Sequence, residues 1–203
     1  MKIPDALLLA TENKGKFAEI SAIIRESIGN QITILSLLDL DEKIDLGDEI
    51  GSSFCEIAEA KARAAMNATG IASLGDDSWL CVDVLGGAPG IRSHRWVDVP
   101  DDQTRNSALL TALSRHPGEW AASFITCVAL CIPDQTSITA QGELRGKIVP
   151  APRGASGFGY DPIFQASGLG LTLAELSAAE KNRVSHRRNA IQNLLASAQW
   201  NVQ

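Results

Sequence analysis

The chain has 203 residues, of which 45% are hydrophobic and 21% are charged. This composition is typical of a folded domain with a sizeable core and excludes a disordered chain. The net charge of −6 argues against binding to DNA or RNA backbones, which favour basic surfaces. No apolar run approaches the roughly 20 residues of a membrane-spanning helix, and the first residues do not resemble a signal peptide. We therefore expect a cytoplasmic protein that binds neither membranes nor nucleic acid.

Strands and helices are predicted to alternate in the first half of the chain. Apolar runs indicate strands over 7–10 and 32–37, and apolar residues within 17–24 recur at helical spacing between them. A second helix is expected to follow an N-cap at Ser52 or Ser53.

The middle of the chain mixes short apolar segments with turn signals. We expect strand segments over 71–75 and 80–84, separated by a polar turn, and a loop over the glycine-rich residues 86–90. A helix is expected over 104–115, before a Pro-Gly pair.

The second half predicts a hairpin and then helices. Strands over 120–132 and 136–149 are expected to pair as a hairpin. Ser177 and Glu180 have the spacing of a capping box, and Ser185 is placed to cap the last helix. The chain is thus expected to be α/β. The hairpin region is a candidate second lobe, and a cleft between lobes would be the default ligand site.

The four cysteines are spaced in a way that favours neither a disulfide framework nor a zinc site. They form no C-x-x-C pair and have no histidine partner at ligand spacing. We expect all of them to be small core residues, namely Cys55, Cys81, Cys127 and Cys131.

Residues Thr11–Lys16 lie between the first strand and the first helix. Backbone N–H groups at a helix start attract anions, and Asn13, Lys14 and Lys16 add an amide and two positive charges. These features indicate a phosphate site, although the spacing of a P-loop is absent. The alternative is a capped helix with solvated lysines.

The pair Asp76-Asp77 follows an apolar segment. Adjacent carboxylates repel one another and favour a cation, and hard oxygen ligands next to phosphate favour Mg²⁺. An acid from the preceding acidic loop, which includes Asp48 and Glu49, could complete such a metal site. The alternative is an Asx turn.

Two further clusters occur near the C-terminus. Glycines flank Phe158 and Tyr160, which favours close approach of a flat base, although a tight loop with core aromatics is the alternative. Lys181 and the basic residues 186–188 lie near the start of the last helix, where a basic cluster is unfavourable unless an anion binds. The alternative is a surface-exposed basic helix end.

In this order, the motifs resemble those of the inosine/xanthosine triphosphate pyrophosphatase family. The resemblance rests on residues 9–16, 76–78, 82–90, 158–162, 174–176 and 181–187. It implies an elongated mixed β-sheet flanked by helices, in one domain over 1–203 with two lobes and a central cleft, and a homodimer. It also implies Mg²⁺-dependent hydrolysis of modified purine nucleoside triphosphates such as dITP, ITP and XTP to the monophosphate and pyrophosphate.

The resemblance also implies roles for individual residues. Asp77 is the expected catalytic base and a metal ligand, with Asp48 or Glu49 as the further ligand. The expected substrate-binding residues are Thr11, Glu12, Asn13, Lys14, Gly15 and Lys16 in the first loop, Lys61 and Ser78 near the metal, and Phe158, Gly159, Tyr160, Asp161, Lys181, His186 and Arg187 around the base and sugar.

Some residues depart from the family pattern. Glu12 and Trp79 stand where glycine is common, and Ile57 replaces a common asparagine. Trp79 either lines the cleft or packs in the core. These changes leave open a related enzyme for pyrimidine or methylated nucleotides, and a nucleotide-binding homologue with impaired catalysis.

Overall fold

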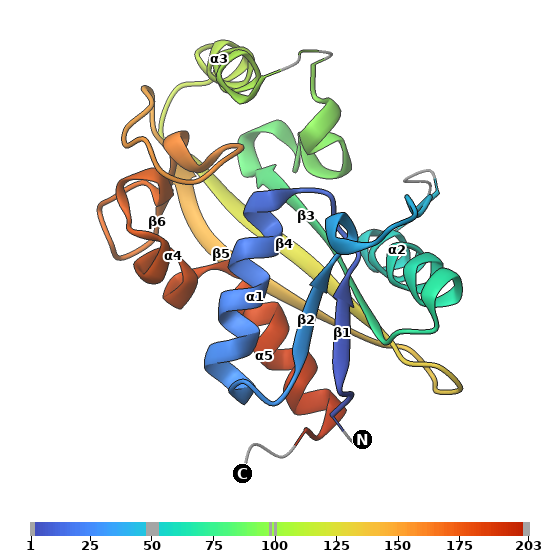
Figure 1. The fold of residues 1–203 in the computed structure, drawn as a ribbon. Coiled ribbons are helices and arrows are strands. Elements are labelled where there is room, and N and C mark those ends of the chain that lie inside the picture. The colour runs from blue at the N-terminus through green and yellow to red at the C-terminus, as the bar shows by residue number, and fades with distance from the viewer. Residues whose placement is uncertain (1–2, 48–52, 98, 100, 201–203) are drawn as a thin grey trace. The chain divides into compact units, whose positions relative to one another are not determined.

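A computed structural model describes residues 3–47, 53–97, 99 and 101–200 of the chain. Its strands are β1 (Ala6–Leu9), β2 (Thr33–Ser36), β3 (Ser73–Val82), β4 (Trp120–Cys131), β5 (Ile138–Ile148) and β6 (Phe164–Ala166). Its α-helices are α1 (Lys14–Ile28), α2 (Phe54–Thr69), α3 (Asp102–Leu113), α4 (Ala178–Val184) and α5 (His186–Ala198) (Figure 1). None of the helices in these ranges is long and apolar enough to cross a membrane.

The strands form a mixed sheet in the order β2-β1-β3-β4-β5-β6. Strand β1 pairs in parallel with β2 and β3, whereas β5 and β6 are antiparallel. The predicted α/β class with a mixed sheet flanked by helices is therefore confirmed.

Local signals predicted several element boundaries correctly. Ser53 caps α2 in a capping box with Glu56, and Ser177 caps α4 in the same way with Glu180. Both pairs satisfy backbone N–H groups that a helix start leaves without intrahelical partners.

The chain divides into two compact units. Unit 1 comprises Met1–Ser78, Thr126–Gly142 and His186–Gln203, and unit 2 comprises Trp79–Ile125 and Glu143–Ser185. Trp79, at the start of unit 2, is 3% exposed and is therefore a buried residue.

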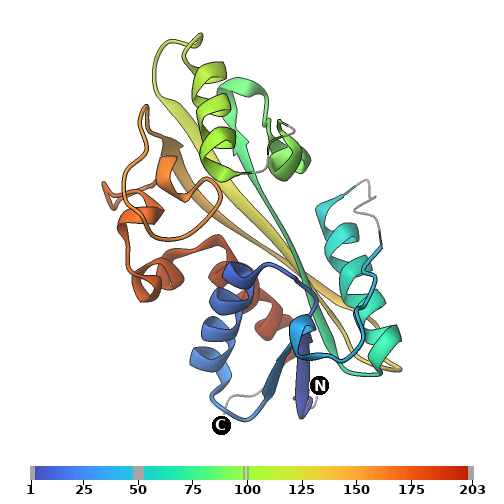
Figure 2. The same ribbon diagram turned by 45° about the horizontal axis from the view of Figure 1, so that its top comes forward.

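In unit 1, the sheet carries apolar side chains on both faces. Leu7 and Leu9 belong to a cluster with residues of α1 and α5, whereas Leu8 lies in a separate cluster with Ala65 of α2. Because side chains alternate along a strand, this division places α1 and α5 on one face of β1 and α2 on the other. The two ribbon views agree with this arrangement (Figures 1 and 2). Unit 2 has its own apolar cluster, which includes Leu80, Leu109, Leu113 and Phe164.

Strand β3 runs unbroken through Ser73–Val82, so the expected polar turn between two short strands is wrong. The residues between the two expected strands, 76–79, were interpreted as a turn, but their backbone is extended within β3, and α2 packs directly on this strand at Gly75. A Cβ at Gly75 would lie 2.1 Å from the carbonyl oxygen of Ala58, so only glycine permits this close approach. The aspartates consequently lie within a strand of the sheet.

The expectation that all four cysteines are unpaired core residues is also wrong. Cys55 of α2 and Cys127 of β4 form a disulfide although they are 72 residues apart, while Cys81 and Cys131 are free. Spacing gave no signal because the pairing depends on how α2 packs against the sheet, which brings the two Cα atoms within 5.2 Å.

This pairing predicts the number of reactive thiols. When the purified protein is denatured without reductant and treated with iodoacetamide, we expect mass spectrometry to find two alkylated cysteines, Cys81 and Cys131. Alkylation after reduction should modify all four and serves as the control. Four modified cysteines without reductant would contradict the disulfide.

Candidate functional site

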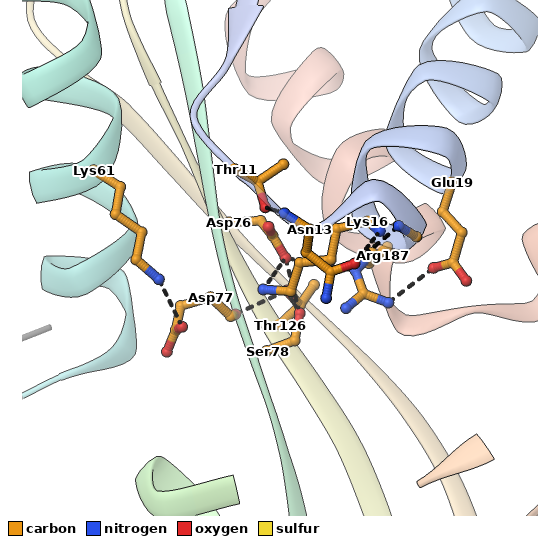
Figure 3. A network of polar contacts seen from close by, with 11 residues as sticks. Thr11, Asn13, Lys16, Glu19, Lys61, Asp76, Asp77, Ser78, Thr126 and Arg187 are labelled. Carbon is orange, nitrogen blue, oxygen red and sulfur yellow. Dashed lines mark hydrogen bonds and ion pairs between the residues drawn. The ribbon is translucent and has the colours of Figure 1, made fainter. Parts of the chain in front are cut away.

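A network of charged and polar side chains surrounds the middle of β3 in unit 1 (Figure 3). Lys16 and Arg187 contact Asp76, whereas Lys61 contacts the neighbouring Asp77. Since adjacent residues of a strand point to opposite faces, each aspartate meets a different set of helices. Asp76 faces α1 and α5, and Asp77 faces α2.

The carboxylate of Asp76 is the most deeply buried charge of this network. Its Oδ2 lies 3.1 Å from the Lys16 ammonium and 3.5 Å from Nε of Arg187, and it accepts a hydrogen bond of 3.0 Å from the Ser78 hydroxyl. Its Oδ1 is buried and has no hydrogen-bond partner in the described part of the chain. A buried charge is tolerated only when it is paired, so Asp76 fixes the side chains that neutralise it.

The ionisation of this cluster follows from burial and charge. Burial alone would raise the pKa of Asp76, but the charges of Lys16 and Arg187 outweigh it and lower that pKa to about 2. For Lys16, burial dominates and lowers the pKa of the ammonium, although Asp76 opposes the change. Asp76 is therefore a carboxylate at neutral pH.

Asp77 is held through both its side chain and its backbone. Its Oδ1 lies 3.3 Å from Nζ of Lys61, and both side chains keep some exposure, 15% and 13%. Its carbonyl oxygen accepts a hydrogen bond of 2.8 Å from Thr126 of β4, and the Thr126 and Ser78 hydroxyls lie 2.6 Å apart. The Asp77 carboxylate is thus fixed in position and still accessible to solvent.

The loop between β1 and α1 is a helix cap. The side-chain oxygen of Asn13 accepts hydrogen bonds from the backbone N–H groups of Gly15 and Lys16, at 2.9 and 3.1 Å. Thr11 accepts one from the N–H of Asn13. Of the two lysines, Lys14 is exposed and Lys16 is buried, so the alternative of a cap with solvated lysines holds for Lys14 alone. Glu12 is exposed and its carboxylate lies 3.6 Å from Nζ of Lys43.

The basic start of α5 is buried, so the alternative of an exposed helix end is wrong for His186 and Arg187. Arg187 reaches Glu19 of α1 as well as Asp76, with 2.8 Å between Nη1 and the Glu19 carboxylate. The neighbouring Arg188 pairs instead with Glu26, at 2.8 Å. These ion pairs hold α5 against α1.

The remaining predicted residues gather in unit 2. Asp161 is buried, forms an ion pair with Lys181 and accepts a hydrogen bond of 2.8 Å from the N–H of Phe158. The Lys181 ammonium lies 4.6 Å from the centre of the Phe158 ring, which is a cation–π distance. Tyr160 is buried in the apolar cluster and its hydroxyl donates to the carbonyl of Ser93; burial raises the pKa of this hydroxyl.

The predicted site residues therefore form two clusters, one in each unit. Unit 1 contains the loop 11–16, Lys61, Asp77, Ser78, His186 and Arg187. Unit 2 contains residues 158–161 and Lys181. Asp48 and Glu49 lie outside the described residues. Within the described ranges, no group of three or more His, Cys, Asp or Glu side chains could hold a metal ion.

Some residues of these clusters were not predicted. Glu19 lies three residues after Lys16 on the same face of α1, which is a signal that the sequence carried. Thr126 is one of two hydroxyl residues in a mostly apolar strand and gave only a weak signal. Asp76 was predicted as half of a carboxylate pair, but its charged partners are Lys16 of α1 and Arg187 of α5.

Comparison with known proteins assigns the chain to a family. The sequence profile of the Ham1 family matches residues 7–197. The chain belongs to the Ham1 family.

Relatives of this Ham1 protein share most of its length. A protein of Streptomyces avermitilis named dITP/XTP pyrophosphatase is 44% identical over 93% of this chain and 94% of its own. One of Geobacter sulfurreducens with the same name is 43% identical over 96% of both chains.

Solved structures agree with this assignment of the Ham1 protein. A HAM1 protein from Coxiella burnetii superposes with a TM-score of 0.82 at 34% identity, covering 96% of this chain and 98% of its own. A dITP/XTP pyrophosphatase from Mycobacterium abscessus superposes with a TM-score of 0.72 at 38% identity, covering 94% and 98%.

The low pKa of Asp76 predicts a pH-dependent contribution to stability. Its folded-state pKa of about 2 lies below its ordinary value of 3.8, so the stabilisation is present above pH 4 and is lost as the pH falls towards 2. Asp76→Asn should lower the free energy of unfolding at pH 7 by roughly 2–5 kcal/mol, because it leaves Lys16 and Arg187 buried beside a neutral group.

Urea denaturation between pH 7 and pH 2.5 measures this effect. The difference between wild type and Asp76→Asn should shrink below pH 4. Asp134→Asn, in the exposed turn after β4, should unfold like wild type throughout. A difference at Asp76 that is constant with pH would contradict the ion-pair explanation.

Proposed function

We propose that this Ham1 protein hydrolyses dITP, ITP and XTP to the nucleoside monophosphate and pyrophosphate, and that it uses Mg²⁺. The observation that carries the proposal is the network of unit 1, in which Lys16 of α1 and Lys61 of α2 each form an ion pair with one of the adjacent aspartates of β3. The names of the relatives from Streptomyces avermitilis and Geobacter sulfurreducens support the same reaction.

Lys16 and Lys61 are the proposed phosphate ligands. Without ligand, each ammonium is neutralised by an aspartate, at 3.1 Å and 3.3 Å. Phosphoryl transfer depends mainly on positioning and on neutralising the charge of the phosphates. In the proposal, phosphate oxygens share or replace the carboxylates as partners of these lysines. Asp76 keeps Lys16 in position.

Asp77 is the proposed metal ligand and catalytic base. Its carboxylate is partly exposed, and hard oxygen atoms suit Mg²⁺, which in proteins is held by one or two carboxylates together with substrate phosphates. Asp48 or Glu49 would supply the further ligand. A bound Mg²⁺ would neutralise phosphate charge and lower the pKa of a bound water. Asp77 would orient the attacking water and accept its proton.

Residues 158–161, Lys181, His186 and Arg187 are proposed to bind the base and sugar. In the proposal, the enzyme distinguishes purine bases by the group at position 6. The keto oxygen of hypoxanthine accepts hydrogen bonds, whereas the amino group of adenine donates them. A pocket of donors leaves that amino group without a partner, which typically costs about 1–3 kcal/mol.

The cytoplasmic location and the homodimer expected from the sequence stay predictions.

A nucleotide panel tests the reaction and the substrate together. We expect purified protein with Mg²⁺ to release pyrophosphate from ITP, dITP and XTP at least about tenfold faster than from ATP, because one unpaired buried group costs about that factor. Asp77→Asn should lower the rate with ITP at least about a hundredfold, since general base catalysis is lost. Asp134→Asn, which replaces an exposed aspartate, is the matched control.

Other outcomes of these assays would contradict parts of the proposed function. Equal rates with all purine nucleotides would contradict the proposed selectivity, and faster hydrolysis of pyrimidine or methylated nucleotides would favour the related enzyme. Release of orthophosphate without pyrophosphate would contradict the proposed cleavage into the monophosphate and pyrophosphate. Tight binding of ITP without turnover would indicate a binding protein. An Asp77→Asn variant as active as wild type would exclude Asp77 as the base.

A further inference from the structure

Helix α3 holds the loop that carries Phe158, although none of its residues was predicted to take part in the site. The side chains of Asp102 and Asn106 lie one helical turn apart and both reach Gly159. The Gly159 N–H donates to the Asp102 carboxylate at 2.6 Å, and its carbonyl accepts from Nδ2 of Asn106 at 3.0 Å. Both hydrogen-bonding groups of this residue are therefore held by one helix.

The same loop is fixed from a second side. The N–H of Phe158 donates to Asp161, and Asp161 is in turn paired with Lys181. Because the Lys181 ammonium lies over the Phe158 ring, a base that stacks on this ring would use the opposite face. The position of the ring then depends on the backbone on either side of it.

The start of α3 is itself well defined. Asp101 caps the helix by accepting a hydrogen bond of 2.7 Å from the N–H of Thr104. Asp102 forms an ion pair with Arg105, which holds its carboxylate in place. Asn106 is 4% exposed, so burial restricts the movement of its amide group. Its Oδ1 has no hydrogen-bond partner among the residues that the structure describes.

We propose that Asp102 and Asn106 are positioning residues that set nucleobase discrimination by fixing the Phe158–Gly159 segment. This inference rests on the proposed function, because it takes the Phe158 loop as the base-binding element. Asp102 and Asn106 touch the loop backbone and act through it. Asp77 and the proposed phosphate ligands Lys16 and Lys61 belong to unit 1, so we expect changes in α3 to alter binding of the base and to leave the chemical step unchanged.

Substitutions in α3 test this role. Asp102→Ala and Asn106→Leu each remove one hydrogen bond to Gly159, and each should raise the KM for ITP about tenfold while kcat stays within about twofold. The ratio of kcat/KM for ITP to that for ATP should fall by a similar factor. Asp102→Asn retains an acceptor oxygen and should restore most of the loss. Gln103→Ala, with an exposed side chain on the same helix, is the matched control and should behave as wild type.

A purely structural role would give another pattern. Melting temperatures of all variants show whether each one is folded. If Asn106→Leu, which changes a buried residue, fails to fold, the positioning role is tested by Asp102→Ala and by its rescue in Asp102→Asn. Folded variants with the KM and the ITP/ATP ratio of wild type would overturn the proposal. Equal losses for every nucleotide, without a change in the ratio, would overturn it as well.

Binding measurements separate this inference from the proposed reaction. If wild type binds ITP but does not hydrolyse it, the proposed function fails, and calorimetry should still show about tenfold weaker ITP binding by Asp102→Ala. If wild type hydrolyses ITP and Asp102→Ala retains both affinity and selectivity, only the positioning role fails. If wild type neither binds nor hydrolyses ITP, both are wrong.

Discussion

The buried carboxylate of Asp76 is the interaction on which unit 1 depends. Removing a charge from water is costly, and this one is tolerated because Lys16 and Arg187 approach the same oxygen from two helices. Arg187 continues to Glu19, so α1, β3 and α5 are joined through a chain of alternating charges. The Lys16 ammonium consequently has a defined position on the sheet. In the proposed reaction, that position is what makes it a phosphate ligand.

Strand geometry separates the two aspartates and gives them different properties. Asp76 points to the face of α1 and α5 and is fully buried, whereas Asp77 points towards Lys61 and keeps contact with solvent. One carboxylate can thus serve the structure while its neighbour remains accessible for the metal and the water of the proposed reaction. Gly75 makes this arrangement possible, since α2 approaches β3 too closely for any side chain at that position.

Much of the fold could be predicted from the sequence because its signals are local. Helix caps such as Ser53 with Glu56 lie within one turn, and apolar periodicity marks α1 and the long strands. Features that depend on tertiary packing could not be predicted. The Cys55–Cys127 disulfide joins residues 72 positions apart, and Asp102 reaches a loop more than fifty residues further along the chain. Residues 76–79 were misjudged as a turn because aspartates and serine after a glycine usually mark one, whereas here they belong to an inner strand of the sheet.

In the proposed reaction, a polyphosphate binds between the lysines and the aspartates of unit 1. A crystal structure with Mg²⁺ and an inosine triphosphate analogue whose α–β bridge cannot be hydrolysed would show this binding. We expect phosphate oxygens within hydrogen-bond distance of Nζ of Lys16 and Lys61, and the metal bound to the Asp77 carboxylate. Phosphates bound far from Asp77, with the Lys61–Asp77 ion pair unchanged, would contradict this binding mode.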